Sequence, residues 1–189
     1  SSSLFFVSPG QINFLVPKEI GFTTDPLVFR GSIGTVFVTR NGELIADGNI
    51  SFAAPAPGLF MLNADLLGPP AGSLLRVKAN GQRSYEPIAD YDQARKRFVS
   101  RPIDLGDETD SVYLILFGSG IRGRSSLSAV SLKLAEFDSP AIYAGPQGDY
   151  AGLDQVNALI PRSLKGRGEV RLACIVDGKP ANQTRIAFQ

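Results

Sequence analysis

The chain contains the same short motif twice. Residues 11–17 read Gln-Ile-Asn-Phe-Leu-Val-Pro, and residues 155–161 read Gln-Val-Asn-Ala-Leu-Ile-Pro. The shared residues are amides, aliphatic side chains and a proline, not the nucleophiles, acids or metal ligands of a reaction centre. The repeat therefore predicts two copies of one structural framework, whose recurring residues are Gln11, Asn13, Pro17, Gln155, Asn157 and Pro161.

The similarity extends beyond the motif. Segments that flank the motif align in the same order in the two copies. The copies differ in length only in the loops that connect these segments, Gly21–Ile33 in the first copy and Gln147–Leu153 in the second. Length differences confined to loops are typical of one β framework with different surfaces. The aligned segments are residues 5–9 with 142–146, 36–42 with 172–178, and 50–52 with 186–188.

Apolar and polar residues alternate in many short runs, such as residues 34–40 and 169–176. This period of two predicts short strands at close spacing, and hence an all-β chain. Residues 92–98 have the best helical pattern, but we interpret this segment as a hairpin tip. Pairs that supply the positive φ angles of tight hairpins stand at Asn41-Gly42, Asn80-Gly81 and Asp177-Gly178.

We expect two tandem immunoglobulin-like β-sandwich domains. The first comprises residues 1–104, is expected to lack strands upstream of the first residue, and carries an added hairpin formed by residues 85–88 and 98–103. The second comprises residues 105–189 and is the more complete. The boundary is placed at the polar run 106–110, which is typical of a linker and equally compatible with a long surface turn.

Composition restricts the classes of function. The chain has 189 residues and a formal net charge of +1, without the basic stripe of a nucleic-acid binder. Its longest apolar stretches, such as residues 112–117, are far shorter than the ~20 residues of a membrane-spanning helix. One cysteine and no histidine exclude an internal disulfide, a multi-cysteine metal site and the usual general base. We therefore expect no cofactor and no metal.

Residues 118–123 read Gly-Ser-Gly-Ile-Arg-Gly, follow an apolar run and precede Asp138 by the spacing of a dinucleotide-binding fingerprint. That mechanism needs a helix beginning at the glycines to hold the pyrophosphate. Only residues 124–129 precede the next alternating segment, too few for a crossover helix. We interpret the glycines as the point where a strand bends and leaves its sheet.

Other reactive groups also have structural interpretations. Cys174 alternates with Val170, Leu172 and Val176, which predicts a small core residue. The acidic residues of one loop suggest calcium ligation or a glycosidase pair, but they lack the spacing of a calcium-binding loop, and a solvated turn is favoured. These residues are Asp104, Asp107, Glu108 and Asp110, with Asp90 and Asp92 as a second pair.

The repeated amides lie on one face of their predicted strands. From there they can bond loop backbone, which we favour, or hold the hydroxyl groups of a sugar. Four tyrosines offer stacking surfaces for a sugar but are more typical of packing residues: Tyr85, Tyr91, Tyr143 and Tyr150.

The chain resembles a known family in residues 7–17, in 56–60, which read Ala-Pro-Gly-Leu-Phe, and in 143–146 and 152–157. This is an uncharacterised carboxy-terminal domain family of large secreted proteins of soil bacteria. The second half, from 112–120 to 185–188, is similar to immunoglobulin-like IPT or TIG modules. The resemblance implies a non-catalytic, extracytoplasmic module. The chain start lacks the features of a signal peptide, which fits a fragment of a longer parent chain.

The sequence therefore favours a structural or adhesive module of a secreted or cell-surface protein. Its partner would be a protein or polysaccharide at the cell surface, with no nucleic acid and no membrane insertion. The alternative is a carbohydrate-binding module that uses the amides and tyrosines. A hydrolase built on Asp107 and Asp110 is the third hypothesis and would need two carboxylates converging on a cleft.

Overall fold

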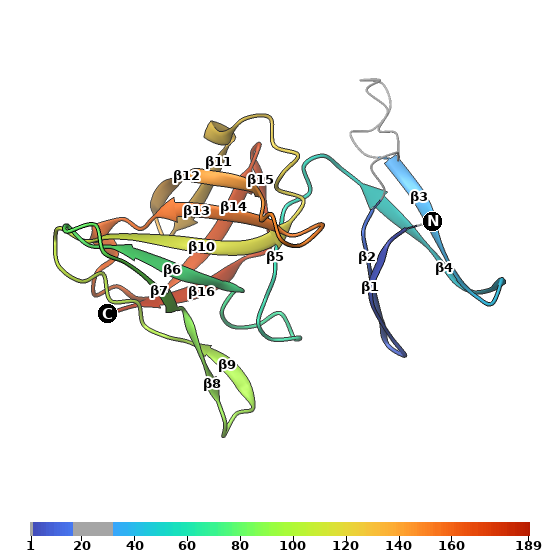
Figure 1. Cartoon of the computed structure of the whole chain (residues 1–189), viewed down its shortest axis with the longest axis horizontal. Helices are drawn as coiled ribbons and strands as arrows, with labels where there is room; N and C mark the ends of the chain where they lie inside the picture. Colours follow the sequence, from blue (N-terminus) through green and yellow to red (C-terminus); the bar gives the residue numbers. More distant parts are fainter. Residues whose placement is uncertain (1, 17–31) are drawn as a thin grey trace. The chain divides into compact units, whose positions relative to one another are not determined.

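The computed structural model describes residues 2–16 and 32–189 (Figure 1). In these residues the regular structure is almost entirely β-strand, with two short 3₁₀ turns, which confirms the expected all-β class. Within the described ranges, no helix has the length and apolar character needed to cross a membrane. The elements are β1 (Leu4–Ser8), β2 (Gln11–Phe14), β3 (Ser32–Arg40), β4 (Glu43–Phe52), β5 (Gly58–Leu59), β6 (Gly72–Val77), β7 (Arg83–Pro87), β8 (Ala89–Asp92), β9 (Arg97–Ser100), β10 (Ser111–Ser119), η1 (Leu127–Ala129), β11 (Val130–Leu134), β12 (Phe137–Pro146), β13 (Asp154–Leu159), η2 (Arg162–Leu164), β14 (Gly168–Val176), β15 (Lys179–Pro180) and β16 (Thr184–Phe188).

The chain forms two compact units, Ser1–Ala54 (unit 1) and Pro55–Gln189 (unit 2). This division differs from the expected domains, residues 1–104 and 105–189, because strands from both sides of that boundary pair with each other. β6 pairs with β10 along its whole length. The backbone N–H of Ile103 donates to the carbonyl oxygen of Ala187, in the last strand β16, at 2.7 Å. The polar run 106–110 is therefore a turn within unit 2.

Unit 2 has two layers joined by one strand. β12 pairs with β11 over its first half and with β13 over its second half, and its register shifts between Ala141 and Tyr143. The first layer continues from β11 to β14, which also pairs with β15 and β16. The second layer runs through β13, β10, β6 and β7, which Figure 1 shows as neighbours, and β5 pairs with the end of β10. This arrangement is a β-sandwich in character.

The core of unit 2 lies between these layers. Alternate residues of each strand face it, as in β10, where Val112, Leu114 and Leu116 are at most 2% exposed. Facing side chains come from β14, among them Leu172 and Cys174, which are fully buried. One continuous apolar cluster therefore includes residues from before and after position 104.

Sequence-predicted turns and the hairpin tip are found where expected. Asn41-Gly42 and Asp177-Gly178 have positive φ at both residues, and Gly81 has φ of 81°. Residues 92–98 form the tip between β8 and β9, with Asp92 opposite Arg97. The added hairpin consists of these two strands, whereas residues 85–87, expected in it, belong to β7 and pair with β6.

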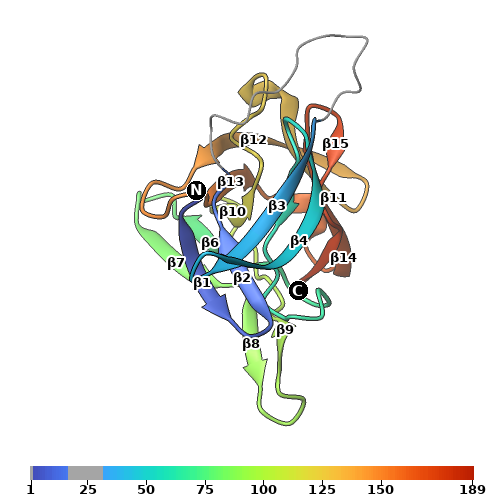
Figure 2. The ribbon, with the colours of Figure 1, turned by 90° about the vertical axis from the view of Figure 1, so that its right-hand side faces the viewer.

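Unit 1 consists of two antiparallel hairpins, β1–β2 and β3–β4, each side by side in both views (Figures 1 and 2). Among the described residues each hairpin is a sheet of two strands. Several of its apolar side chains are exposed, including Leu4 at 60% and Val7 at 62%. Pro17 and most of the loop Gly21–Ile33 lie outside the described residues.

Strand register is the same in the two copies of the repeat. Phe6 lies opposite Asn13 in β1–β2, as Tyr143 lies opposite Asn157 in β12–β13, and both pairs follow an equivalent irregularity. The second hairpin repeats this agreement: the pairs Gly34–Ile50, Thr35–Asn49, Val36–Gly48 and Arg40–Glu43 of β3–β4 correspond to Val170–Ile186, Arg171–Arg185, Leu172–Thr184 and Val176–Lys179 of unit 2.

Candidate functional site

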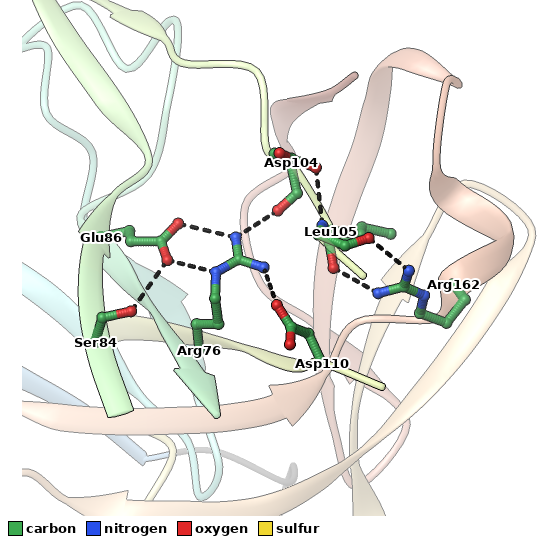
Figure 3. Close-up of polar contacts among 8 residues, drawn as sticks. Arg76, Ser84, Glu86, Asp104, Leu105, Asp110 and Arg162 are labelled. Atoms are coloured by element: carbon green, nitrogen blue, oxygen red, sulfur yellow. Dashed lines mark hydrogen bonds and ion pairs between the residues drawn. The ribbon is translucent and has the colours of Figure 1, made fainter. Parts of the chain in front are cut away.

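A buried arginine lies at one edge of the sandwich (Figure 3). Arg76 is 8% exposed, and its guanidinium donates to both carboxylate oxygens of Glu86, at 2.6 and 3.0 Å. It also donates to the carboxylate of Asp110 at 3.3 Å and to the carbonyl of Asp104 at 2.7 Å. The hydrogen bond from Arg76 lowers the pKa of Glu86, and the hydrogen bond to Glu86 raises the pKa of Arg76. Arg162 donates to two further carbonyls of the same turn, so the two arginines brace it.

The acidic loop is part of this brace. The carboxylate of Asp104 accepts from the backbone N–H of Gly106 at 2.8 Å, and that of Asp110 faces Arg76. Among the described residues, no three Asp, Glu, His or Cys side chains gather as a metal ion would require. The loop that holds Asp107 and Glu108 is thus positioned by internal bonds, and its geometry does not favour the calcium or glycosidase hypotheses.

The two residues of the second acidic pair, both on β8, have different hydrogen-bond partners. Asp90 forms an ion pair with Arg101, which lowers the pKa of Asp90 through their hydrogen bond. Asp92 instead accepts from backbone N–H groups of the hairpin tip, the nearer at 2.9 Å. Tyr91 packs edge-on against Phe98, with ring centroids 5.2 Å apart. These side chains stabilise the hairpin.

The glycines of residues 118–123 allow two backbone segments to approach closely. A side chain on Gly118 would place its Cβ 2.2 Å from the carbonyl oxygen of Gly58. Gly120 has φ of +70°, and its Cβ would lie 2.0 Å from the carbonyl oxygen of Ala56. The strand β10 ends here, and no helix follows at once. The glycines therefore have a structural role at the end of β10, where they admit the backbone of residues 56–58.

The backbone N–H groups of this turn donate to a carboxylate of the protein itself. Asp154, fully buried on β13, accepts from the backbone N–H groups of Ile121 at 2.7 Å and Arg122 at 3.1 Å. The side chain of Arg122 completes the ion pair. Asp138, the acidic residue at fingerprint spacing, is exposed on β12 and pairs with Lys133 at 3.8 Å. The sequence did not single out Asp154, although it directly precedes the repeated motif.

Cys174 lies in the core, as its alternation predicts. It is fully buried, and burial raises the pKa of its thiol to about 12. A thiol with this pKa is almost entirely protonated at neutral pH, and the thiolate is the nucleophilic form. Cys174 therefore acts as a small apolar core residue.

The repeated amides bond to each other along their strands. Gln11 Nε2 donates to Asn13 Oδ1 at 2.7 Å, and Gln155 Nε2 donates to Asn157 Oδ1 at 2.8 Å. The first pair is exposed, and the second is half-buried. Each amide keeps further donor or acceptor positions for another partner. Pro161 precedes η2 and caps it with extended backbone, while Pro17 lies outside the described residues.

The second amide pair lies on the outer face of the β12–β13–β10–β6–β7 layer. Cross-strand partners in register share one face of a sheet. Three rows therefore form on this face, which alternates with the core-facing side: Leu159, Tyr113, Leu75 and Tyr85; Tyr143, Asn157, Ile115, Ser73 and Pro87; Gly145, Gln155 and Phe117. We call this set the outer sheet face. These three rows contain aromatic rings and amides. A fourth row on the same face, Ser111, Val77 and Arg83, adds one charged residue beside Tyr85.

The outer sheet face was only partly predictable. Of the four tyrosines singled out in the sequence, Tyr85 and Tyr143 lie on it, at 72% and 40% exposure, while Tyr91 and Tyr150 do not. Tyr113 was missed, although its alternation with Val112 and Leu114 places it on the face opposite the core.

No family model, curated protein or solved structure matches the chain.

Proposed function

We propose that the chain is a non-catalytic structural or adhesive module of a secreted or cell-surface bacterial protein. On this proposal unit 2 is an immunoglobulin-like, IPT/TIG-type sandwich, and the order of motifs supports membership of the carboxy-terminal domain family of secreted soil-bacterial proteins. The observation that carries the proposal is that the reactive groups serve the fold: Asp154 binds a turn, Arg76 holds Glu86, and Cys174 is buried with a raised pKa.

The outer sheet face is the proposed adhesive surface. A partner that covers the three rows removes no charged group from water, because the one charged residue of the face, Arg83, lies in the row beyond them. Tyrosine rings supply a large rigid contact area, and their hydroxyl groups and the amides supply hydrogen bonds. Such a mixture of aromatic and uncharged polar groups is typical of binding surfaces.

Adhesion is tested with beads that carry the purified chain. We expect retention on bacterial cell surfaces, and we expect Tyr85→Ala to reduce it at least tenfold. Tyr150→Ala is the matched control, because Tyr150 is 69% exposed and lies in a loop outside the face, whereas Tyr85 is 72% exposed on it. Equal retention of the two variants would contradict the assignment of this face.

The second candidate is a carbohydrate-binding module. It is favoured by the position of Asn157 beside Tyr143 on neighbouring strands, where one sugar ring can stack on the tyrosine and bond the amide. The test is co-sedimentation with a panel of insoluble polysaccharides, comparing Asn157→Ala with the wild-type chain. Retention on a polysaccharide that is lost in the variant would select this candidate. Bead adhesion destroyed by protease but not by periodate, which cleaves sugars, would select a protein partner.

A further inference from the structure

We propose that unit 1 is a strand-accepting half-sandwich that binds two extended segments equivalent to β10 and β11 of unit 2. This inference goes beyond the proposed adhesive function and rests on a comparison of the two copies. The occupant is a stretch of polypeptide separate from residues 1–189. It has uncharged apolar side chains at alternate positions and joins the free edges of β2 and β3.

The first observation is the edges left open in unit 1. In unit 2, β13 pairs with β12 on one edge and with β10 on the other. Its counterpart β2 pairs with β1 in the equivalent register, and among the described residues has no strand on the other edge. In the same way β14 pairs with β11 and β16, while its counterpart β3 pairs with β4 alone in the described part of the chain.

The second observation is the exposure of side chains at core positions. Ile12 corresponds to Val156 in the repeat, and the exposed fraction of the residue is 37% for Ile12 and 0% for Val156. Val7 corresponds to Ala144, with exposed fractions of 62% and 0%. Apolar residues are thus placed for a core that two hairpins do not enclose. An isolated two-stranded hairpin is at best marginally stable in water, so further strands are required.

Unit 2 shows the chemistry of the missing strands. β10 presents Val112, Leu114 and Leu116 to the core, and β11 presents Val130 and Leu132. An added strand of this kind gains main-chain hydrogen bonds for affinity and fills the apolar face with alternate side chains for specificity. In its described residues, a second copy of unit 1 would bring the same two hairpins and no counterpart of β10 or β11. We therefore assign the site to a different segment.

The test supplies the missing strands in cis. By the alignment of Phe6 with Tyr143, the first residue corresponds to residue 138, so a copy of residues 110–137 is joined in front of the full chain. The readout is amide hydrogen exchange in residues 11–14 and 32–40. We expect exchange there to slow at least about 100-fold relative to the ungrafted chain.

Two variants of the graft serve as controls. A graft with aspartate at the copied positions of Leu114 and Leu116 should give no protection, because both residues face the core in unit 2. A graft with serine at the copied position of Tyr113 should protect fully, because that residue faces outward. Unchanged exchange with the wild-type graft would overturn the proposal. So would a concentration-dependent dimer of the ungrafted chain in which β2 is already protected, since the occupant would then be a second copy.

Discussion

Removal of the Asp154 carboxylate tests how the 118–123 turn is held. In Asp154→Ala the backbone N–H groups of Ile121 and Arg122 lose their acceptor. A buried donor left without a partner costs about 1–3 kcal/mol, so two donors give about 2–6 kcal/mol. The Arg122 side chain is 38% exposed and turns to water, and the variant no longer buries a charge. We therefore expect the lower part of this range, a loss of about 2–3 kcal/mol.

The assay is urea unfolding of the full chain followed by far-ultraviolet circular dichroism. Asp154→Asn keeps one acceptor oxygen but directs an amide donor toward the guanidinium of Arg122, so a loss of about 1–2 kcal/mol is expected. Asp138→Ala is the control: its side chain is 64% exposed, and exposed ion pairs contribute at most about 1 kcal/mol. A loss below about 1 kcal/mol in Asp154→Ala, equal to that of the control, would refute the reasoning.

Three further predictions concern the turn, the ion pair and the thiol. Gly120→Ala should lower the free energy of unfolding by at least about 2 kcal/mol, measured by thermal unfolding, because Gly120 has a positive φ and a Cβ there would meet a carbonyl oxygen. Gly123→Ala is the control and should change the free energy of unfolding little, because no atom lies within 4 Å of its Cβ. The hydrogen bond from Arg76 lowers the pKa of Glu86 in the folded chain below its ordinary value of 4.5, so it stabilises the fold while Glu86 is ionised. This stabilisation is present above pH 4.5 and is lost as the pH falls through the lowered pKa. Glu86→Gln should therefore flatten the decline of melting temperature between about pH 5 and pH 3. Cys174→Val should change stability by less than about 1.5 kcal/mol, and the native thiol should react with a disulfide reagent only after unfolding.

Local features of the fold followed from the sequence. Asn41-Gly42 and Asp177-Gly178 are recognisable because few residues tolerate positive φ, and the burial of Cys174 followed from its period of two. The repeated motif predicted a shared framework, and the strand registers agree in detail. These signals are local or recur in the same chain, so one sequence suffices to detect them.

The features that the sequence did not predict depend on distant pairing. Nothing in residues 72–77 indicates that β6 joins β10, and this pairing moves the division of the chain to Ala54. The role of Asp154 requires the 118–123 turn to be brought beside β13. The outer sheet face is assembled from five strands, so Tyr113 and Tyr143 become neighbours of the amides only when the sheet has formed.

The strand shared by both layers affects how unit 2 unfolds. The first half of β12 belongs to one layer and the second half to the other. If one layer loses its hydrogen bonds to β12, the half of the strand that remains in the other layer is disturbed as well. A species with one layer intact and the other melted would keep half of this strand ordered beside an exposed apolar surface. We therefore expect unit 2 to melt in one cooperative transition, with the same midpoint by circular dichroism and tyrosine fluorescence.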